Sequence, residues 1–276
     1  MDWLTVLLGI AVAAIRFGQG LESEGNNTAS LKPWLVTKAV LAVIFLVPII
    51  FLVLIFVFKP TLAITCALII MACSPAANLS NKALYALGGD ISLTNRIELI
   101  VSLISIVTTP VLLEIIKIIL GLNLNVKVSM IVAQLVISQF IPTILGELLR
   151  KWQPKTIYYA KFIIKGASTL LMLIFALLII QHDQAFEQVR IVGYAAVAVA
   201  TMSAFFLGAL CAGKDLKQQI SLAIETGLRN PGLAYLIASE NFIAEKANVM
   251  MVPYTVTVLV TITLCALILK SYPRRI

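Results

Sequence analysis

Long apolar runs joined by short polar connections make up most of the chain. A helix needs about 20 mainly apolar residues to cross a bilayer, and by that measure the pattern predicts nine spans. They cover about residues 2–19, 36–57, 60–88, 92–120, 127–149, 157–181, 189–211, 216–240 and 247–270. The connections between them are too short to form a soluble domain. We therefore expect an all-α integral membrane protein with one polytopic domain over residues 1–276.

Two of the predicted spans, 60–88 and 216–240, are interrupted by polar segments that contain proline. The first interruption reads Cys73-Ser74-Pro75-Ala76-Ala77-Asn78-Leu79-Ser80-Asn81, and the second reads Glu225-Thr226-Gly227-Leu228-Arg229-Asn230-Pro231-Gly232. Irregular backbone at membrane depth must be buried in protein or line a wet cavity. Paired interruptions at corresponding places in two halves typically mark the binding site of a transporter. The pattern therefore predicts a protein that carries a solute across a membrane.

The two broken spans lie at equivalent places in half-repeats of about 1–121 and 126–270, where each is the last span but one. They are five spans apart, so they cross the bilayer in opposite directions. This arrangement is typical of inverted repeats whose half-helix ends meet near the midplane. N-terminal half-helix ends attract anions, and unwound carbonyl groups attract cations.

Composition and charge support a membrane protein and exclude other classes. The chain is 61% hydrophobic and 12% charged, with a mean hydropathy of +1.02, whereas soluble domains are about 25% charged. The net charge of +8 comes from residues in short connections, so a nucleic-acid partner is not expected. The basic residues on one side are Arg16, Lys32, Lys38, Arg150, Lys151, Lys155, Lys214, Lys217, Lys270, Arg274 and Arg275, and those on the other side are Lys59, Lys127, Arg190 and Lys246. The positive-inside rule then predicts a multi-pass protein of the cell membrane with its N-terminus outside and its C-terminus in the cytoplasm.

The interruptions and the end of the first span resemble the bile acid:sodium symporter family. The first broken helix of that family carries a Cys-Pro-Gly-Gly-x-x-Ser-Asn-like motif, to which residues 73–81 are similar. The second carries Glu-x-Gly-x-Gln-Asn, which residues 225–230 match in all but one fixed position. Phe17-Gly18-Gln19-Gly20-Leu21 is similar to the family's first-span exit, and Lys32-Pro33 to the entry of the next span. The resemblance covers nearly the whole chain.

The resemblance implies a core domain with two crossing broken helices beside a panel of the remaining helices. It also implies small or amphipathic organic anions as substrates, with sodium as the coupled ion and no other cofactor. One sodium site would use Ser80, Asn81, Thr94, residue 98 and Glu225. The second would use residue 43, Glu225, residue 229 and carbonyl groups around Thr226 and Leu228. Asn230 closes the second motif and is a further candidate for ion or substrate binding.

Five positions depart from the family pattern, two of them being Ala76 and Ala77 in place of the glycines of the first motif. Position 229, usually Gln, is Arg229, which is always charged and has no acceptor. Position 43, where the family has another Gln, is Val43, and position 98, usually a hydroxyl residue, is Glu98. One hypothesis is that Arg229 acts as a tethered cation beside Glu225, while Glu98 and Arg96 complete a local network, so that sodium coupling is weakened or lost. The competing hypothesis is that Glu98 strengthens the first site and coupling to one sodium ion survives.

Several functional interpretations stay open. Glu98 and Arg96 are equally well interpreted as a surface pair near the end of a span. We interpret Glu114 and Lys117 as a structural pair one helical turn apart. A membrane enzyme is not expected, because the chain has one histidine, in a predicted loop, and no evident constellation of buried catalytic groups. A non-transporting sensor on a transporter fold is the alternative to transport. Substrate identity and oligomeric state do not follow from the sequence.

Overall fold

The computed structural model describes residues 3–22, 33–75, 84, 87–124, 126–242 and 246–271. In this part of the chain, seven helical segments are long and apolar enough to cross a membrane. They are Trp3–Glu22, Pro33–Phe58, Ile91–Ile119, Val128–Trp152, Pro154–Gln181, Ile191–Cys211 and Ala247–Leu269. They correspond in order to the seven unbroken spans that the sequence predicts. The prediction of an all-helical membrane protein is confirmed.

The second predicted broken span is two short helices, α12 (Leu216–Gly227) and α13 (Pro231–Asn241). The first broken span begins with α4 (Leu62–Cys73), a 12-residue helix. The remainder of that interruption, including Ser80 and Asn81, lies outside the described residues. The expected break of each span is therefore present at Ser74 and at Leu228.

The other elements are, in chain order, α1 (Trp3–Glu22), α2 (Pro33–Leu41), η2 (Ala42–Leu46), α3 (Val47–Phe58), α6 (Ile91–Ile119), α7 (Val128–Leu135), η3 (Val136–Phe140), α8 (Ile141–Trp152), η4 (Pro154–Thr156), α9 (Ile157–Gln181), α10 (Gln184–Gln188), α11 (Ile191–Cys211) and α14 (Ala247–Ser271). Two of them, η2 and η3, are π-helical turns that end two residues before Pro48 and Pro142. Proline clashes with the carbonyl group of the residue four positions earlier, and a wider turn relieves that clash inside a continuous span.

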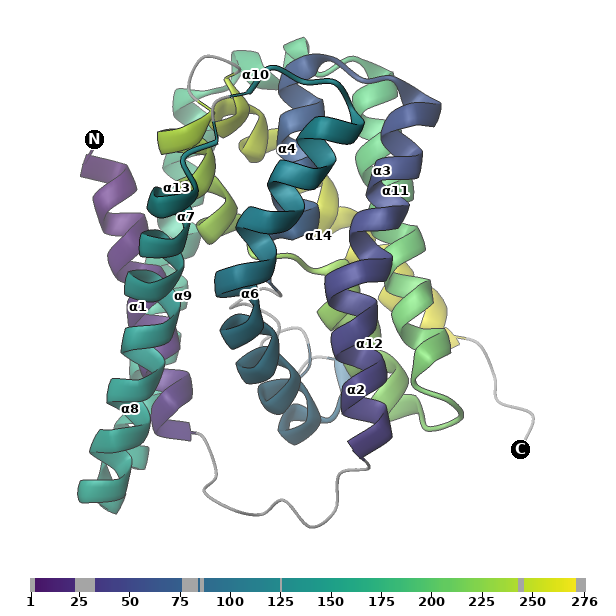
Figure 1. Cartoon of the computed structure of the whole chain (residues 1–276). Helices are drawn as coiled ribbons and strands as arrows, with labels where there is room; N and C mark the ends of the chain where they lie inside the picture. Colours follow the sequence, from purple (N-terminus) through teal and green to yellow (C-terminus); the bar gives the residue numbers. More distant parts are fainter. Residues whose placement is uncertain are drawn as a thin grey trace.

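Helices α8 and α9 each pack on α1 along one side of the molecule (Figure 1). A Cβ atom on Gly20 of α1 would lie 2.2 Å from the Thr143 carbonyl oxygen, and one on Gly146 of α8 would lie 2.3 Å from the Phe17 carbonyl oxygen. Only glycine at both positions allows the two backbones to approach so closely, as is common between helices in membranes. We call α1, α8 and α9 the three-helix group.

Large apolar side chains cover the outside of the helices. Ile191 is 84% exposed, Phe162 79% and Ile180 73%. Such a surface is unfavourable in water, and lipid chains are the solvent that suits it. The helical content, the span lengths and this apolar surface together show a multi-pass membrane protein.

Candidate functional site

The two helix breaks meet in the interior of the molecule. The backbone N–H of Asn230, in the second break, donates to the carbonyl oxygen of Pro75, in the first, at 3.1 Å. Figure 1 shows the α12–α13 connection crossing the molecule just beyond the end of α4. Leu228 and Asn230 are 4% and 1% exposed, so this irregular backbone is buried in protein as membrane depth requires.

Arg229 caps the C-terminal end of α4. The last carbonyl groups of a helix lack regular partners within it; in α4 the Met71 oxygen accepts from the N–H of the C-cap Ser74 at 3.2 Å, and those of Ala72 and Cys73 follow it. The Arg229 guanidinium donates from Nε to the Met71 oxygen at 3.2 Å and from Nη2 to the Ala72 oxygen at 2.9 Å. The Thr109 hydroxyl of α6 donates to the Cys73 oxygen at 2.7 Å. A cation here also complements the negative end of the helix dipole.

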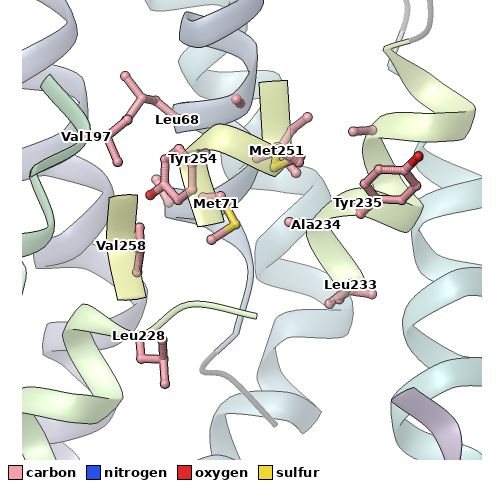
Figure 2. Close-up of a cluster of buried hydrophobic side chains, with 14 of the residues drawn as sticks. Leu68, Met71, Val197, Leu228, Leu233, Ala234, Tyr235, Met251, Tyr254 and Val258 are labelled. Atoms are coloured by element: carbon pink, nitrogen blue, oxygen red, sulfur yellow. The ribbon is translucent and has the colours of Figure 1, made fainter. Parts of the chain in front are cut away.

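The environment of this cap is apolar. Arg229 is 2% exposed, and it lines a cavity with Met71, Leu228 and Val258. Figure 2 shows these three apolar side chains gathered around the crossing, together with Tyr254. Hydrogen bonds to a charged group are electrostatically stronger in such a low-dielectric setting than in water. The guanidinium is therefore firmly held at the end of α4.

Glu225 is fully buried one helical turn before Arg229. Its carboxylate is close enough to both Arg229 and Arg16 to interact electrostatically with each. The two hydrogen bonds of Arg229 go to carbonyl groups of α4 rather than to this carboxylate. The predicted proximity of Arg229 to Glu225 is thus present, and Arg229 also has backbone hydrogen-bond acceptors that the sequence did not indicate.

Three other predicted site residues, with hydroxyl or amide side chains, lie in the described part of the chain, and all three are buried: Thr94, Thr226 and Asn230. Thr94 donates to the Asp90 carbonyl at 3.0 Å, and Thr226 donates to the Leu222 carbonyl at 2.8 Å. Asn230 is the N-cap of α13, where its side-chain oxygen accepts from the Leu233 N–H at 3.1 Å. A hydroxyl or amide oxygen has two lone pairs, so one hydrogen bond does not prevent it from coordinating an ion. The assignment of these residues as sodium or substrate ligands stays a prediction.

Glu98 has a different partner from the one the sequence suggested. Arg16 of α1 lies 3.7 Å from Glu98 Oε1, and the Gln19 amide nitrogen donates to Oε2 at 2.9 Å. Arg16 also donates to the Gln19 side-chain oxygen at 3.1 Å. Glu98 is 2% exposed, so the interpretation as a surface pair is wrong. Among the described residues no ion pair joins Glu98 to Arg96; the network instead links α6 to the three-helix group.

The predicted pair of Glu114 with Lys117 is confirmed.

Three members of these buried networks, Arg16, Gln19 and Thr109, were not predicted from the sequence. Arg16 was counted among the charges that orient the protein, although it lies inside the predicted span 2–19. That position was the available signal, because an arginine within a span must find a buried partner or reach the interface. Thr109 gave no signal, since a threonine in a helix usually bonds to its own backbone.

Comparison with known proteins bears on the family. A family model described as the sodium bile acid symporter family matches residues 7–188. The uncharacterized sodium-dependent transporter YocS of Bacillus subtilis (strain 168) is 24% identical over 246 residues, which are 87% of this chain and 76% of that protein. The family model covers more than half of the chain and includes the first helix break. The chain therefore belongs to the sodium bile acid symporter family, a family of membrane transporters.

Proposed function

We propose that the chain is a secondary transporter of organic anions that works by alternating access, and that the guanidinium of Arg229 replaces one coupled sodium ion. Family membership supports the transport activity. The observation that carries the second part is the capping of α4 by Arg229, through the Met71 and Ala72 carbonyl groups. Unwound carbonyl groups of this kind are the typical ligands of a coupled cation in such transporters.

In the proposed cycle, the helices that hold the crossing move against the three-helix group and expose the crossing to one side of the membrane and then to the other. The N-terminal end of α13, at Asn230 and Pro231, provides a partial positive charge for the anion. The Arg229 side chain adds a full positive charge beside it. Both features favour an anionic solute.

The space beside Arg229 supports replacement of the ion. Val43 and Arg229 line the same small cavity at the end of α4, of about 10 Å³. A cavity of that size barely accommodates one water molecule. Val43 offers no oxygen to a cation, and Arg229 itself donates to the carbonyl groups. A sodium ion at this place would have to displace the guanidinium.

The test is the thermal stability of the purified protein in sodium chloride against choline chloride at equal ionic strength. The variants are Arg229→Gln and the double variant Val43→Gln with Arg229→Gln, which restores both family residues. We expect no sodium response in the wild type and a saturable rise in unfolding temperature in the double variant. A ligand at 100 times its Kd adds about 2.7 kcal/mol to folding stability. Arg190→Gln, at an exposed helix start, is the control.

A double variant that responds to sodium no more strongly than the wild type would contradict the tethered cation. Sodium stabilisation of the wild type would favour the hypothesis that the first site binds one sodium ion. Glu98 then becomes the residue to change, although both of its carboxylate oxygens already have partners on α1. Accumulation of an organic anion in proteoliposomes tests transport separately. Binding without accumulation would favour the non-transporting sensor.

A further inference from the structure

A second polar region lies between α1, α6 and α8, away from the end of α4. Arg16, Glu98 and Glu147 line a small cavity there. Its other polar lining comes from Gln19, Asn95, Ser102 and Thr143. Arg16 and Glu98 are both within the interior, at 3% and 2% exposure. The cavity thus combines one cation and two carboxylates with neutral hydrogen-bonding groups.

We propose that this cavity is a binding site for a small zwitterion, a ligand with one carboxylate and one ammonium group, such as an ω-amino acid. The carboxylate pairs with Arg16 and the ammonium group with Glu98. The proposal rests on the proposed function in one respect, namely that the three-helix group and α6 separate during the transport cycle. It narrows the transported solute to a carboxylate that also carries a positive charge and therefore has no net charge.

The cavity is too small for a ligand while the ion pair is closed. Its volume of about 40 Å³ suits a few water molecules. Arg16 belongs to α1 and Glu98 to α6, so the cavity widens only when these two helices move apart. That movement breaks the ion pair.

Breaking this buried ion pair removes the counter-charge of Glu98 and leaves Arg16 with only its weaker interaction with Glu225, which is strongly unfavourable. A simple anion compensates Arg16 and leaves Glu98 without a counter-charge, and a simple cation does the reverse. A zwitterion compensates both at once. Because Glu147 also lines the cavity, the lining has two carboxylates and one arginine. This excess of negative charge further favours a ligand with an ammonium group. The ion pair therefore selects for a ligand that carries both signs.

The neutral groups of α6 lie along the same face as Glu98. Asn95 is three residues before it and Ser102 four residues after it, so all three are neighbours on one side of the helix. The Ser102 hydroxyl is buried and has no hydrogen-bond partner among the described residues. Buried polar groups in folded proteins rarely lack a partner. A ligand carboxylate or a water molecule in the cavity would supply one.

The experiment measures the unfolding temperature of the purified full chain, in a sodium-free choline buffer, against ligand concentration. The probes are β-alanine, propionate and propylammonium, which share the same carbon chain length, with glycine and the four- and five-carbon ω-amino acids to vary the charge separation. We expect at least one ω-amino acid to raise the unfolding temperature saturably. Propionate and propylammonium at the same concentrations should leave it unchanged.

Two variants move the selectivity in opposite directions. In Glu98→Gln the ammonium partner is lost, so propionate should become a stabilising ligand and the best ω-amino acid should lose at least tenfold in affinity. In Arg16→Gln the carboxylate partner is lost, so propylammonium should become a stabilising ligand. Glu114→Gln, which breaks an ion pair elsewhere on α6, should behave as the wild type does.

The proposal is overturned if no ω-amino acid of the series shifts the wild type, or if propionate shifts it equally. Both of these outcomes are read on the wild type, so neither needs a variant to fold. They are also independent of the sodium test, because binding is read in choline and Arg229 is unchanged. A wild type that binds the zwitterion yet shows no uptake would contradict the proposed transport and leave the binding site intact.

Discussion

Two buried arginine side chains lie within the spans, and they have different kinds of partners. Arg16 faces a carboxylate of another helix, whereas Arg229 faces backbone carbonyl groups. The second arrangement depends on α4 ending in the interior, since only a helix end offers several carbonyl groups to one guanidinium. The break in the span and the departure from the family's Gln at position 229 are thus parts of one structural feature.

Thr109 completes the capping of α4, and its removal tests how much that end contributes to stability. Thr109→Val leaves the Cys73 carbonyl group buried without the hydroxyl at 2.7 Å, which costs about 1–3 kcal/mol. The adjacent Thr108 donates to Ile104 of its own helix and is only partly buried, so Thr108→Val should change stability by less than about 0.5 kcal/mol. Thermal unfolding in detergent compares the two. Equal effects would show that the bond across the helices is energetically unimportant.

At the scale of single residues, the sequence identified the charged side chains that would be unfavourable in contact with lipid. Glu225, Arg229 and Glu98 stand out because a charge in an apolar run needs a reason. Their partners were not predictable in the same way. The carbonyl groups of Met71 and Ala72 are invisible in a sequence, because every residue has one, and Arg16 is 82 positions from Glu98. Only the tertiary fold brings these two side chains together.

At the scale of elements, the break between α12 and α13 is held by local signals and by packing. Asn230 is the N-cap of α13, and Pro231 occupies its first turn, both of which favour a helix start. On the other side, a Cβ atom on Gly208 of α11 would lie 2.2 Å from Thr226 Oγ1. Helix α12 is thereby fixed against α11, and the crossing has a rigid support.

The N-cap can be tested against a matched cap at the start of α12. Asn230→Ala should destabilise the protein by about 1 kcal/mol, and Asn230→Ser should recover most of that loss because serine is also a good cap. Asp215 caps α12 from an exposed position, where its side-chain oxygen accepts from the Gln218 N–H. Asp215→Ala therefore gives the loss of folding stability for a solvent-exposed cap. Unfolding midpoints measure all three. A serine variant as unstable as the alanine variant would mean that the amide of Asn230 has a role beyond capping.

The elements were largely predictable because hydrophobic length is a direct requirement of the bilayer. Seven unbroken spans and the second broken span are present where the pattern predicts them. The π-helical turns before Pro48 and Pro142 were not predicted, since proline alone does not determine whether a helix bends or widens. The half-repeats 1–121 and 126–270 stay a prediction, as does the sodium role of Ser80 and Asn81.

At the scale of the whole molecule, the distribution of basic residues decides which way the protein faces. Arg16 no longer belongs to that comparison, because it is buried in an ion pair. The connections with Arg150, Lys151 and Lys214 still contain more basic residues than those with Lys127 and Arg190. The positive-inside rule therefore continues to place the C-terminus in the cytoplasm.

Helix α11 provides the direct test, because it separates residues 182–190 from residues 212–215 by one crossing of the membrane. Asp183 and Lys214 are both exposed at these two ends, so Asp183→Cys and Lys214→Cys offer matched reporters in a Cys211→Ala background. Of the other native cysteines, Cys66, Cys73 and Cys265 are buried. A membrane-impermeant maleimide applied to intact cells should label position 183 and reach position 214 only after permeabilisation. The reverse pattern would place the N-terminus in the cytoplasm. The Arg16–Glu98 pair, which lies in the half of α1 that ends at Glu22, would then lie toward the outside of the cell instead of the cytoplasm.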